Sequence, residues 1–481
     1  MADSTVIAMP ASTEIIPLLP PGVSLLSLLP TELLDQIIRH AAGQSNLRST
    51  RALRLVCKVF NALASQYGLP SMTAFLHQSD FNAVRTLAAQ PHIAMGVRSF
   101  TYVPDLIVKP LSLEEFRYEY KDLRKMDINE ALTPAMRRRL RKKAILTTGQ
   151  IHTHWQRAKA LYNMQKSLMD DEDDIEFLMD VLPLFPNLNE ISMQSEVMAL
   201  TPGDDPNTRV IRRRPRTPFD DGLAEFSWRP LQPEGLRALN TILEALPTVN
   251  KITALRAGAL NWRFFDASNG PNLTRCLDMA PNLTRIGFQI ETGWDEETET
   301  FGNESIQCRI ALQQGHLREM LRRAQNLEAL YIDFEECGDD DGYPAHLHDI
   351  VQPHQHWPKL RSVEFGGFEC ERQELENFLR THSETLRECF LRSLSLQRTS
   401  WAVFLPALRS HLPKLTDAAI TGALLGEDEE THEEEFWDVA DYTGKRDCMA
   451  AAITAYLTCR EPHGHENPFK IFSYTGDLET V

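Results

Sequence analysis

The chain has 481 residues, of which 42% are hydrophobic and 24% are charged. This balance is typical of a folded globular protein and excludes a chain that is disordered throughout. Lys and Arg number 50 and Asp and Glu number 67, which gives a formal net charge of −17. General nucleic-acid binders and anionic-membrane binders need the opposite sign, so the composition argues against both classes.

The N-terminal stretch is apolar but has neither the pattern of a secretion signal nor that of a membrane helix. No Lys or Arg precedes Arg39, and four prolines interrupt the uncharged residues 15–31. We therefore expect residues 1–23 to form a flexible arm. The eight cysteines contain no Cys-x-x-Cys pair, which predicts reduced thiols in the cytoplasm or nucleus.

Two amphipathic helices are predicted after this arm. In residues 28–38, Pro30 suits the first helical position, and an apolar stripe follows it at Leu33, Leu34, Ile37 and Ile38. Ser49 or Thr50 can cap a second helix, with apolar residues at helical spacing as far as position 64. Helices of this size cannot form a large core alone, so they must pack on the rest of the chain or on a partner.

These residues carry a resemblance to a known family. Leu-Pro-Thr-Glu-Leu-Leu at 29–34, followed by Leu-Arg-Leu-Val-Cys-Lys-Val-Phe at 53–60, resembles the F-box, particularly its fungal type, over about residues 24–68. The polar linker at 40–50 is longer than is usual in that family. An alternative is a helical pair packed wholly inside this chain.

The resemblance implies a fold, a partner and a set of contact residues. An F-box docks on a Skp-type adaptor and, through it, on the cullin of a ubiquitin ligase, while the rest of the chain selects a protein substrate. The adaptor-binding residues it implies are Leu29, Pro30, Leu33, Leu34, Ile37, Ile38, Leu53, Val56, Cys57, Val59 and Phe60.

A helix followed by a short strand recurs along the remaining sequence. In seven places a Pro or a polar residue precedes an apolar residue that opens the strand. The seven apolar residues are Leu188, Val249, Leu283, Leu327, Leu360, Leu386 and Leu415. The last two steps between them, 26 and 29 residues, agree with a leucine-rich repeat, and the longer steps leave room for insertions. An earlier helix at 81–87 and strand at 97–103 form a candidate opening unit.

The predicted fold class is therefore α/β. We expect a small helical F-box followed over 80–481 by an irregular leucine-rich-repeat-like solenoid, in which parallel strands are backed by helices. Insertions are expected at about 112–182, 194–234, 291–312, 335–356 and 425–446. A compact α/β domain is the alternative, because the period is irregular.

The insertions provide candidate substrate contacts. Three are acidic and begin just after a strand, so they would emerge at one edge of the solenoid. A shared negative rim could attract a basic substrate segment; otherwise each run is a solvated loop. The candidate residues are Glu296, Glu297, Asp339, Asp340, Glu429 and Glu430.

Basic runs and histidines give weaker signals. The arginine-rich runs at 137–143 and 212–216 are candidate nuclear import signals, or solvated charges. We find no phosphate loop, nucleophile elbow or zinc helix, and therefore predict no catalytic residue, metal or cofactor. The histidine-containing tracts are read as surface groups rather than metal ligands: His346, His348, His354 and His356, and Cys459 with His463 and His465.

The sequence thus favours a non-catalytic interaction protein, the substrate-recognition subunit of a Skp-cullin-F-box ubiquitin ligase. A scaffold or nuclear regulator with the same fold is the second hypothesis. A hydrolase or metal enzyme ranks last.

Overall fold

The structure is a computed structural model. It describes residues 29–43, 47–104, 106, 112–115, 117–118, 147–194, 234–246, 252–292, 302–334, 342–427, 434–439, 449–458 and 466–471. The chain divides into two compact units, Met1–Gly68 and Leu69–Val481.

The described part of the first unit contains three helices: α1 (Thr31–Gly43), α2 (Leu47–Arg54) and α3 (Lys58–Ser65). The expectation of a single second helix was wrong, because a turn separates α2 from α3. The amide groups of Leu55 and Val56 bond back to the carbonyl groups of Ala52 and Leu53. Cys57 is then fully extended (φ −162°) before α3 begins.

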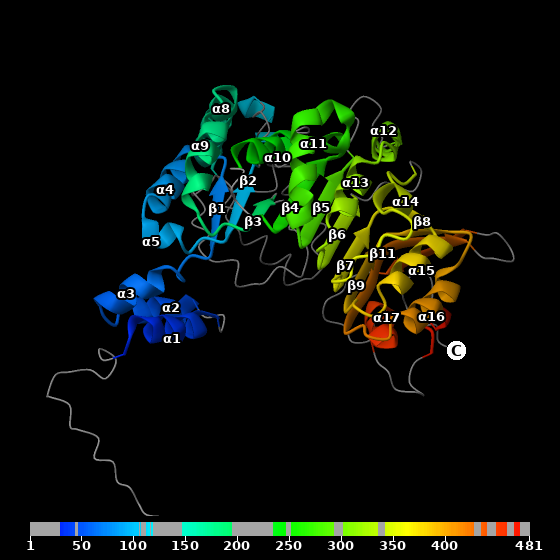
Figure 1. Ribbon diagram of the computed structural model, residues 1–481. Coiled ribbons are helices and arrows are strands. Elements are labelled where there is room, and N and C mark those ends of the chain that lie inside the picture. Colours follow the sequence, from blue (N-terminus) through cyan, green and yellow to red (C-terminus); the bar gives the residue numbers. More distant parts are fainter. Residues whose placement is uncertain are drawn as a thin grey trace, which may run out of the picture. The chain divides into compact units, whose positions relative to one another are not determined.

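The second unit is built on a large sheet, and its α/β class is confirmed. The strands run in the order β1-β2-β3-β4-β5-β6-β7-β9-β11-β10-β8, with β12 added to β11 (Figure 1). All pairings between these strands are parallel apart from β11 with β12. The bounds are β1 Ser71–Phe75, β2 Ser99–Val103, β3 Glu190–Met193, β4 Ala254–Asn261, β5 Arg285–Glu291, β6 Ala329–Phe334, β7 Ser362–Gly366, β8 Glu369–Glu371, β9 Glu388–Arg392, β10 Ser395–Gln397, β11 Asp417–Glu427 and β12 Glu434–Val439.

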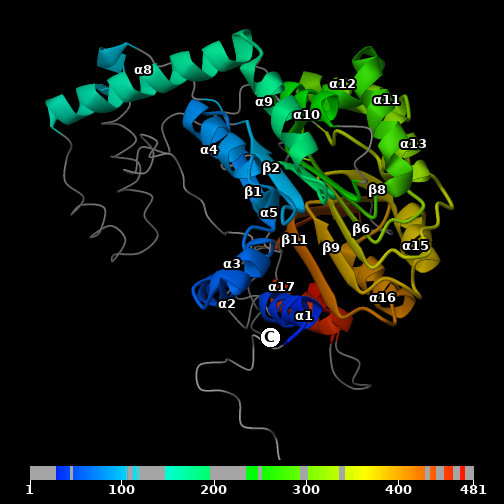
Figure 2. The ribbon, with the colours of Figure 1, turned by 60° about the vertical axis from the view of Figure 1, so that its left-hand side comes forward.

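Helices connect most successive strands and lie along one face of the sheet, as both ribbon views show (Figures 1 and 2), whereas two residues alone join β7 to β8 and β9 to β10. Helix α8 extends away from the sheet (Figure 2). The α-helices are α4 Gln78–Ala88, α5 Pro91–Ala94, α8 Thr148–Asp170, α9 Asp173–Val181, α10 Glu234–Ala245, α11 Gly270–Met279, α12 Gly302–Gln313, α13 His316–Arg323, α14 Leu347–Ile350, α15 Arg372–Thr381, α16 Trp401–His411 and α17 Met449–Thr458. The 3-10 helices are η2 Leu182–Leu184, η5 Trp262–Phe265, η6 Ala267–Asn269, η7 Ala280–Asn282 and η8 Pro468–Lys470.

Two positions before nine of the twelve strands, all except β8, β10 and β12, stands an apolar residue that lies in the core or at its margin. The strand registers align nine such residues, from the first repeat to the last. Eight of them are buried and Leu69 is half-buried. They are Leu69, Val97, Leu188, Ile252, Leu283, Leu327, Leu360, Leu386 and Leu415. The sequence assigned one of these positions to Val249, and this was wrong, because the register of β3 with β4 places Ile252 beside Leu188. Val249 itself lies outside the described residues.

A backbone ladder joins the repeats immediately after these apolar positions. The Thr253 carbonyl group accepts hydrogen bonds from the amides of Thr284 and Arg285, and the Thr284 carbonyl accepts from Glu328 and the residue after it. The same pair of hydrogen bonds recurs at the carbonyl groups of the equivalent residues, which are Arg98, Asn189, Glu328, Arg361 and Arg387. Each repeat therefore satisfies the backbone of its neighbour and fixes the register of the next strand.

Within each strand, side chains alternate between the two faces of the sheet. One set is buried beneath the helices, for example Ile286 and Phe288 on β5. The other set is polar or half-buried, for example Tyr331 on β6 and Glu364 on β7. The second face, opposite the helices, is here called the open face. It is the surface on which residues from successive repeats stand side by side.

Helix α17 covers the end of the repeat array. Its buried side chains Ile453 and Leu457 belong to the main core. The Thr454 hydroxyl donates to the carbonyl oxygen of Ala418 on β11, at 2.7 Å. This contact gives a hydrogen-bond partner to a carbonyl group of the last parallel strand. Helix α17 thereby covers a sheet edge that would otherwise be open to another strand.

Candidate functional site

The predicted adaptor-binding residues fall into two groups in the first unit. Leu34, Ile38 and Phe60 are buried with Ala64, and Leu29 and Leu53 pack against them. Leu34, Ile38 and Phe60 therefore belong to the unit's own core and are not available to a partner, whereas Leu29 and Leu53 are half-buried at its margin. The remaining predicted residues are exposed: Pro30, Leu33, Ile37, Val56, Cys57 and Val59.

Leu55 extends this exposed group, although the sequence reasoning missed it. It is 88% exposed, the highest value among the large apolar residues that the structure describes. It belongs to the Leu-Val-Cys-Lys segment that carried the resemblance, so its motif was the available signal. We call Leu33, Ile37, Leu55, Val56 and Val59 the apolar surface of the first unit.

Polar contacts fix α1 against the end of α3. The Asp35 carboxylate accepts hydrogen bonds from the Gln66 side-chain amide at 2.6 Å and from the Tyr67 hydroxyl at 2.8 Å. The Arg39 guanidinium donates hydrogen bonds to both Asp35, at 2.8 Å, and the Tyr67 hydroxyl, at 3.2 Å. Burial is the main cause that raises the pKa of Tyr67. This network orients α1 and therefore the direction in which Leu33 and Ile37 point.

The open face of the second unit carries charged side chains from neighbouring strands. Glu190 on β3 pairs with Arg285 on β5 at 2.9 Å, and Arg256 on β4 lies 3.9 Å away. On the strands that follow in the sheet, Asp333 on β6 is 3.7 Å from Arg392 on β9. The oppositely charged partners are 59 to 95 residues apart in sequence and meet because the strands that carry them are in register.

The Tyr331, Glu364 and Phe390 side chains are on β6, β7 and β9, the first and last of them two residues before Asp333 and Arg392, and the sequence analysis did not single them out. Tyr331 is paired in register with Glu364, and Glu364 is paired with Phe390. All three are half-buried. Their common offset of four residues from Leu327, Leu360 and Leu386 was a signal that the repeat pattern already contained.

The acidic candidates all lie outside the described residues: Glu296, Glu297, Asp339, Asp340, Glu429 and Glu430. Two of the three segments begin where β5 and β6 end, and these strands are parallel neighbours. The basic runs at 137–143 and 212–216, and Cys459, His463 and His465, are also outside the described part of the chain.

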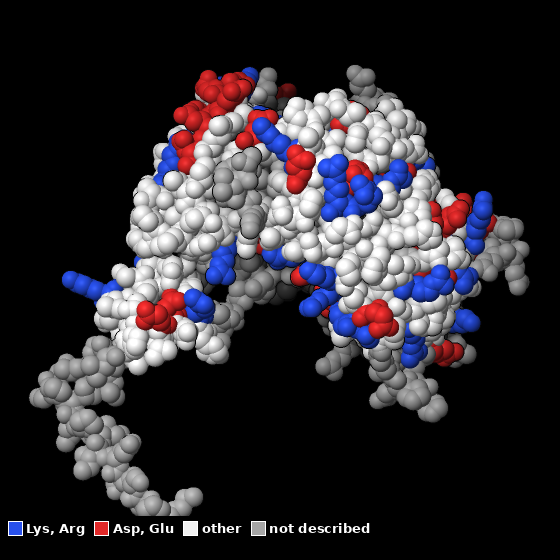
Figure 3. All heavy atoms as spheres, in the orientation of Figure 1, with Lys and Arg blue, Asp and Glu red and all other residues white. Residues whose placement is uncertain are grey.

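Acidic side chains do gather at the turn between α8 and α9, where Figure 3 shows a patch of Asp and Glu. Asp170, Asp171 and Glu172 are exposed there. Asp174, the last residue of the acidic run 170–174, is instead fully buried. Its carboxylate accepts a hydrogen bond from the Arg237 guanidinium, with 2.8 Å between Nη2 and Oδ1. This buried ion pair ties α9 to α10.

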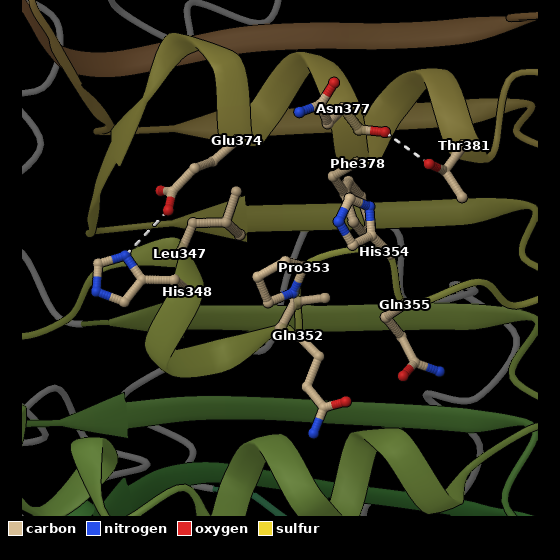
Figure 4. A pocket seen from close by; sticks show the side chains of 11 residues that line it. Leu347, His348, Gln352, Pro353, His354, Gln355, Glu374, Asn377, Phe378 and Thr381 are labelled. Atoms are coloured by element: carbon tan, nitrogen blue, oxygen red, sulfur yellow. Dashed lines mark hydrogen bonds and ion pairs between the residues drawn. The ribbon is translucent and has the colours of Figure 1, made fainter.

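Two histidines of the predicted tract, His348 and His354, line a pocket between α14 and α15 (Figure 4). The His348 ring stacks on His346 at 5.0 Å between centroids, and its Nδ1 is 3.1 Å from the Glu374 carboxylate. Leu347 and Phe378 contribute apolar walls. Among the described residues, no group of three or more His, Cys, Asp or Glu side chains is placed to hold a metal ion.

The fourth histidine of this tract, His356, contacts a buried histidine of the core. His356 stacks on His382 at 5.7 Å. His382 is buried, its Nε2 accepts from the Trp357 backbone amide at 3.0 Å, and its Nδ1 faces the Phe378 carbonyl oxygen at 2.8 Å. Burial lowers the pKa of His382 to about 4, so this ring is neutral and structural at physiological pH.

In the part of the chain that the structure describes, no helix is both long and apolar enough to cross a membrane. Comparison of the sequence with known protein families and with curated proteins finds no match to either.

Proposed function

We propose that this protein is the substrate-recognition subunit of a Skp-cullin-F-box ubiquitin ligase. Its first unit would dock on the Skp-type adaptor, and its second unit would hold a protein substrate. The observation that carries the proposal is the apolar surface of the first unit, which remains exposed although the unit already has a core of its own.

The exposure of these side chains favours a docking role. Leu33 and Ile37 are 45% and 46% exposed and lie one helical turn apart on α1. Val56 and Val59, at 58% and 51%, flank the start of α3. Single exposed apolar residues are common, but several within one short helical unit mark a surface that a partner covers.

The second unit supports the receptor half of the proposal. Its repeats place side chains from many strands on one open face, and such surfaces are suited to binding extended partners. A captured substrate would be held near a ubiquitin-charged enzyme recruited through the cullin. Catalysis would then follow from the raised effective concentration of a target lysine rather than from residues of this chain.

The test is co-expression with a Skp-type adaptor followed by size-exclusion chromatography. The double variant Leu33→Asp with Ile37→Asp places two charges on the apolar surface, where a partner would have to bury them at high cost. The matched control is Ile306→Asp with Ile310→Asp, because these residues are also four apart on a helix and are 57% and 50% exposed.

We expect the wild-type chain and the control variant to co-elute with the adaptor, and the Leu33/Ile37 variant to remain folded but elute alone. Loss of binding by both variants would indicate a general effect of added charge. If the folded wild-type chain does not bind, the ligase proposal is wrong. The chain would then be a scaffold or nuclear regulator that uses the same fold.

A further inference from the structure

The middle of the open face contains a carboxyl group flanked by two aromatic rings. Tyr331, Glu364 and Phe390 occupy equivalent positions on β6, β7 and β9, which are consecutive in the sheet. Adjacent strands are about 4.8 Å apart, so the two rings stand about 10 Å apart with the carboxyl group between them. We call these three residues the Glu364 site.

The neighbouring charges at this site already have partners. The Asp333 carboxylate accepts a hydrogen bond from the Tyr331 hydroxyl at 3.1 Å and lies 3.7 Å from Arg392. It extends over Gly366, where a Cβ atom would come within 1.9 Å of its oxygen. By contrast, no hydrogen bond or ion pair to the Glu364 carboxyl group is found within the described residues.

The electrostatic environment of Glu364 favours the approach of a cation. Burial raises the pKa of this carboxyl group to about 7, and the charge of Asp333 adds to the effect. Arg392 and Arg256 act in the opposite direction but do not cancel it. A cation that reached Glu364 would stabilise its ionised form and offset the cost of burial.

We propose that the Glu364 site binds an arginine side chain of a partner protein, with the guanidinium group paired to the Glu364 carboxylate and stacked against Phe390. The proposal rests on the proposed function only in taking this partner to be the captured substrate. Binding at this site does not itself require the adaptor.

The chemistry of the site favours arginine over lysine. A guanidinium group is planar, donates two parallel hydrogen bonds to one carboxylate and stacks on aromatic faces. It is also less strongly hydrated than an ammonium group, so it loses less when it enters a half-buried site. The Glu364 site offers one carboxylate with an aromatic ring on either side, which matches these properties.

The experiment uses the full chain and three small probes. N-acetyl-arginine methylamide is compared with the corresponding lysine and norleucine compounds by saturation-transfer NMR titration. Glu364→Gln removes the charge and Phe390→Ala removes one ring. Glu388→Gln is the matched control, because this exposed glutamate on β9 carries the same charge outside the Glu364 site.

We expect the arginine probe to bind more tightly than the other two. Loss of a charge-assisted pair should weaken it about tenfold in Glu364→Gln. Phe390→Ala should weaken it severalfold, and Glu388→Gln should change it less than twofold. Affinity of the wild type should rise from pH 6 to pH 8 as Glu364 ionises beside Tyr331, Asp333, Arg392 and Arg256, and this rise should vanish in Glu364→Gln.

Three results would overturn the proposal: no binding of the arginine probe, equal binding of the norleucine probe, or equal weakening by Glu364→Gln and Glu388→Gln. The last would mean general attraction by a chain of net charge −17. Adaptor co-elution of Glu364→Gln separates the two proposals. A chain that loses the arginine probe but still co-elutes supports both, whereas failure of adaptor binding leaves the probe result standing alone.

Discussion

Ile37 and Ile38 are adjacent on α1 but have opposite environments, which permits a matched test of the first unit. The Ile38 side chain is fully buried with Leu34, Phe60 and Ala64. The Ile37 side chain is 46% exposed. Replacement of each by alanine removes the same atoms, so any difference between the two variants arises from position alone.

The expected magnitudes differ strongly. Truncation of a buried isoleucine to alanine costs about 2–5 kcal/mol of unfolding free energy. At about 0.05–0.15 kcal/mol per residue, a unit with roughly 40 ordered residues is stable by only about 2–6 kcal/mol. Ile38→Ala should therefore remove most or all of the stability of this unit. Ile37→Ala should change it by about 0.5 kcal/mol or less, because the side chain is exposed and alanine favours helices.

Hydrogen exchange of the full chain, read by mass spectrometry, measures both effects. In Ile38→Ala, peptides from α1 and α3 should exchange rapidly while peptides from the second unit keep their protection. Ile37→Ala should preserve protection everywhere yet weaken adaptor co-elution. Unchanged protection of α1 and α3 in Ile38→Ala would refute the assignment of this core, and loss of protection in Ile37→Ala would refute the assignment of its surface.

Two further predictions concern the second unit. Because burial holds the folded pKa of His382 near 4, against an ordinary value of 6.5, its contribution to stability is complete above pH 6.5 and is lost as the pH falls towards 4. The difference between 6.5 and 4 in pKa corresponds to at most about 3 kcal/mol of unfolding free energy. His382→Asn should reduce the acid sensitivity and should also lower stability at pH 7, because the Trp357 amide loses its acceptor. Urea unfolding at pH 5 and pH 7 measures both effects. Gly367→Ala should lower the unfolding free energy by about 2–4 kcal/mol, because φ is +69° and the new Cβ would lie 2.3 Å from the Phe334 carbonyl oxygen. Gly149→Ala, with open space around its Cβ position, is the control, and an equal loss there would contradict the steric argument.

The repeat was predictable because it appears in the sequence twice over. A leucine stands two residues before most of the strands, and the strand then alternates apolar and polar residues. At Leu283, Leu327 and Leu360 both signals agree, and all three are fully buried. The error at Val249 arose because Ile252, three residues later, is equally apolar. Only the pairing with β3 distinguishes them.

The elements that were missed lack such a double signal. Strand β1 is short and comes directly after Pro70, before the first recognisable repeat. Strand β12 contains three acidic residues, which favour a solvated loop in isolation. It forms because β11 continues past the end of β9 and offers an antiparallel partner, which no local propensity encodes. The turn that divides α2 from α3 is equally invisible, since its residues fit a helical pattern.

The Glu364 site illustrates a different limit. Within its own strand, each member is simply the polar or half-buried partner of an alternating pair, and nothing local marks it. Tyr331, Glu364 and Phe390 become neighbours because each lies four residues after the leucine of its repeat, at steps of 33 and 26 residues. In a repeat fold, residues at the same offset in successive repeats become neighbours across the sheet, so a binding site is distributed over several repeats.

The apolar surface of the first unit follows the opposite rule. Its residues fall in two short stretches, 33–37 and 55–59, and there the unpredictable part was which side of α1 the unit keeps for its own core.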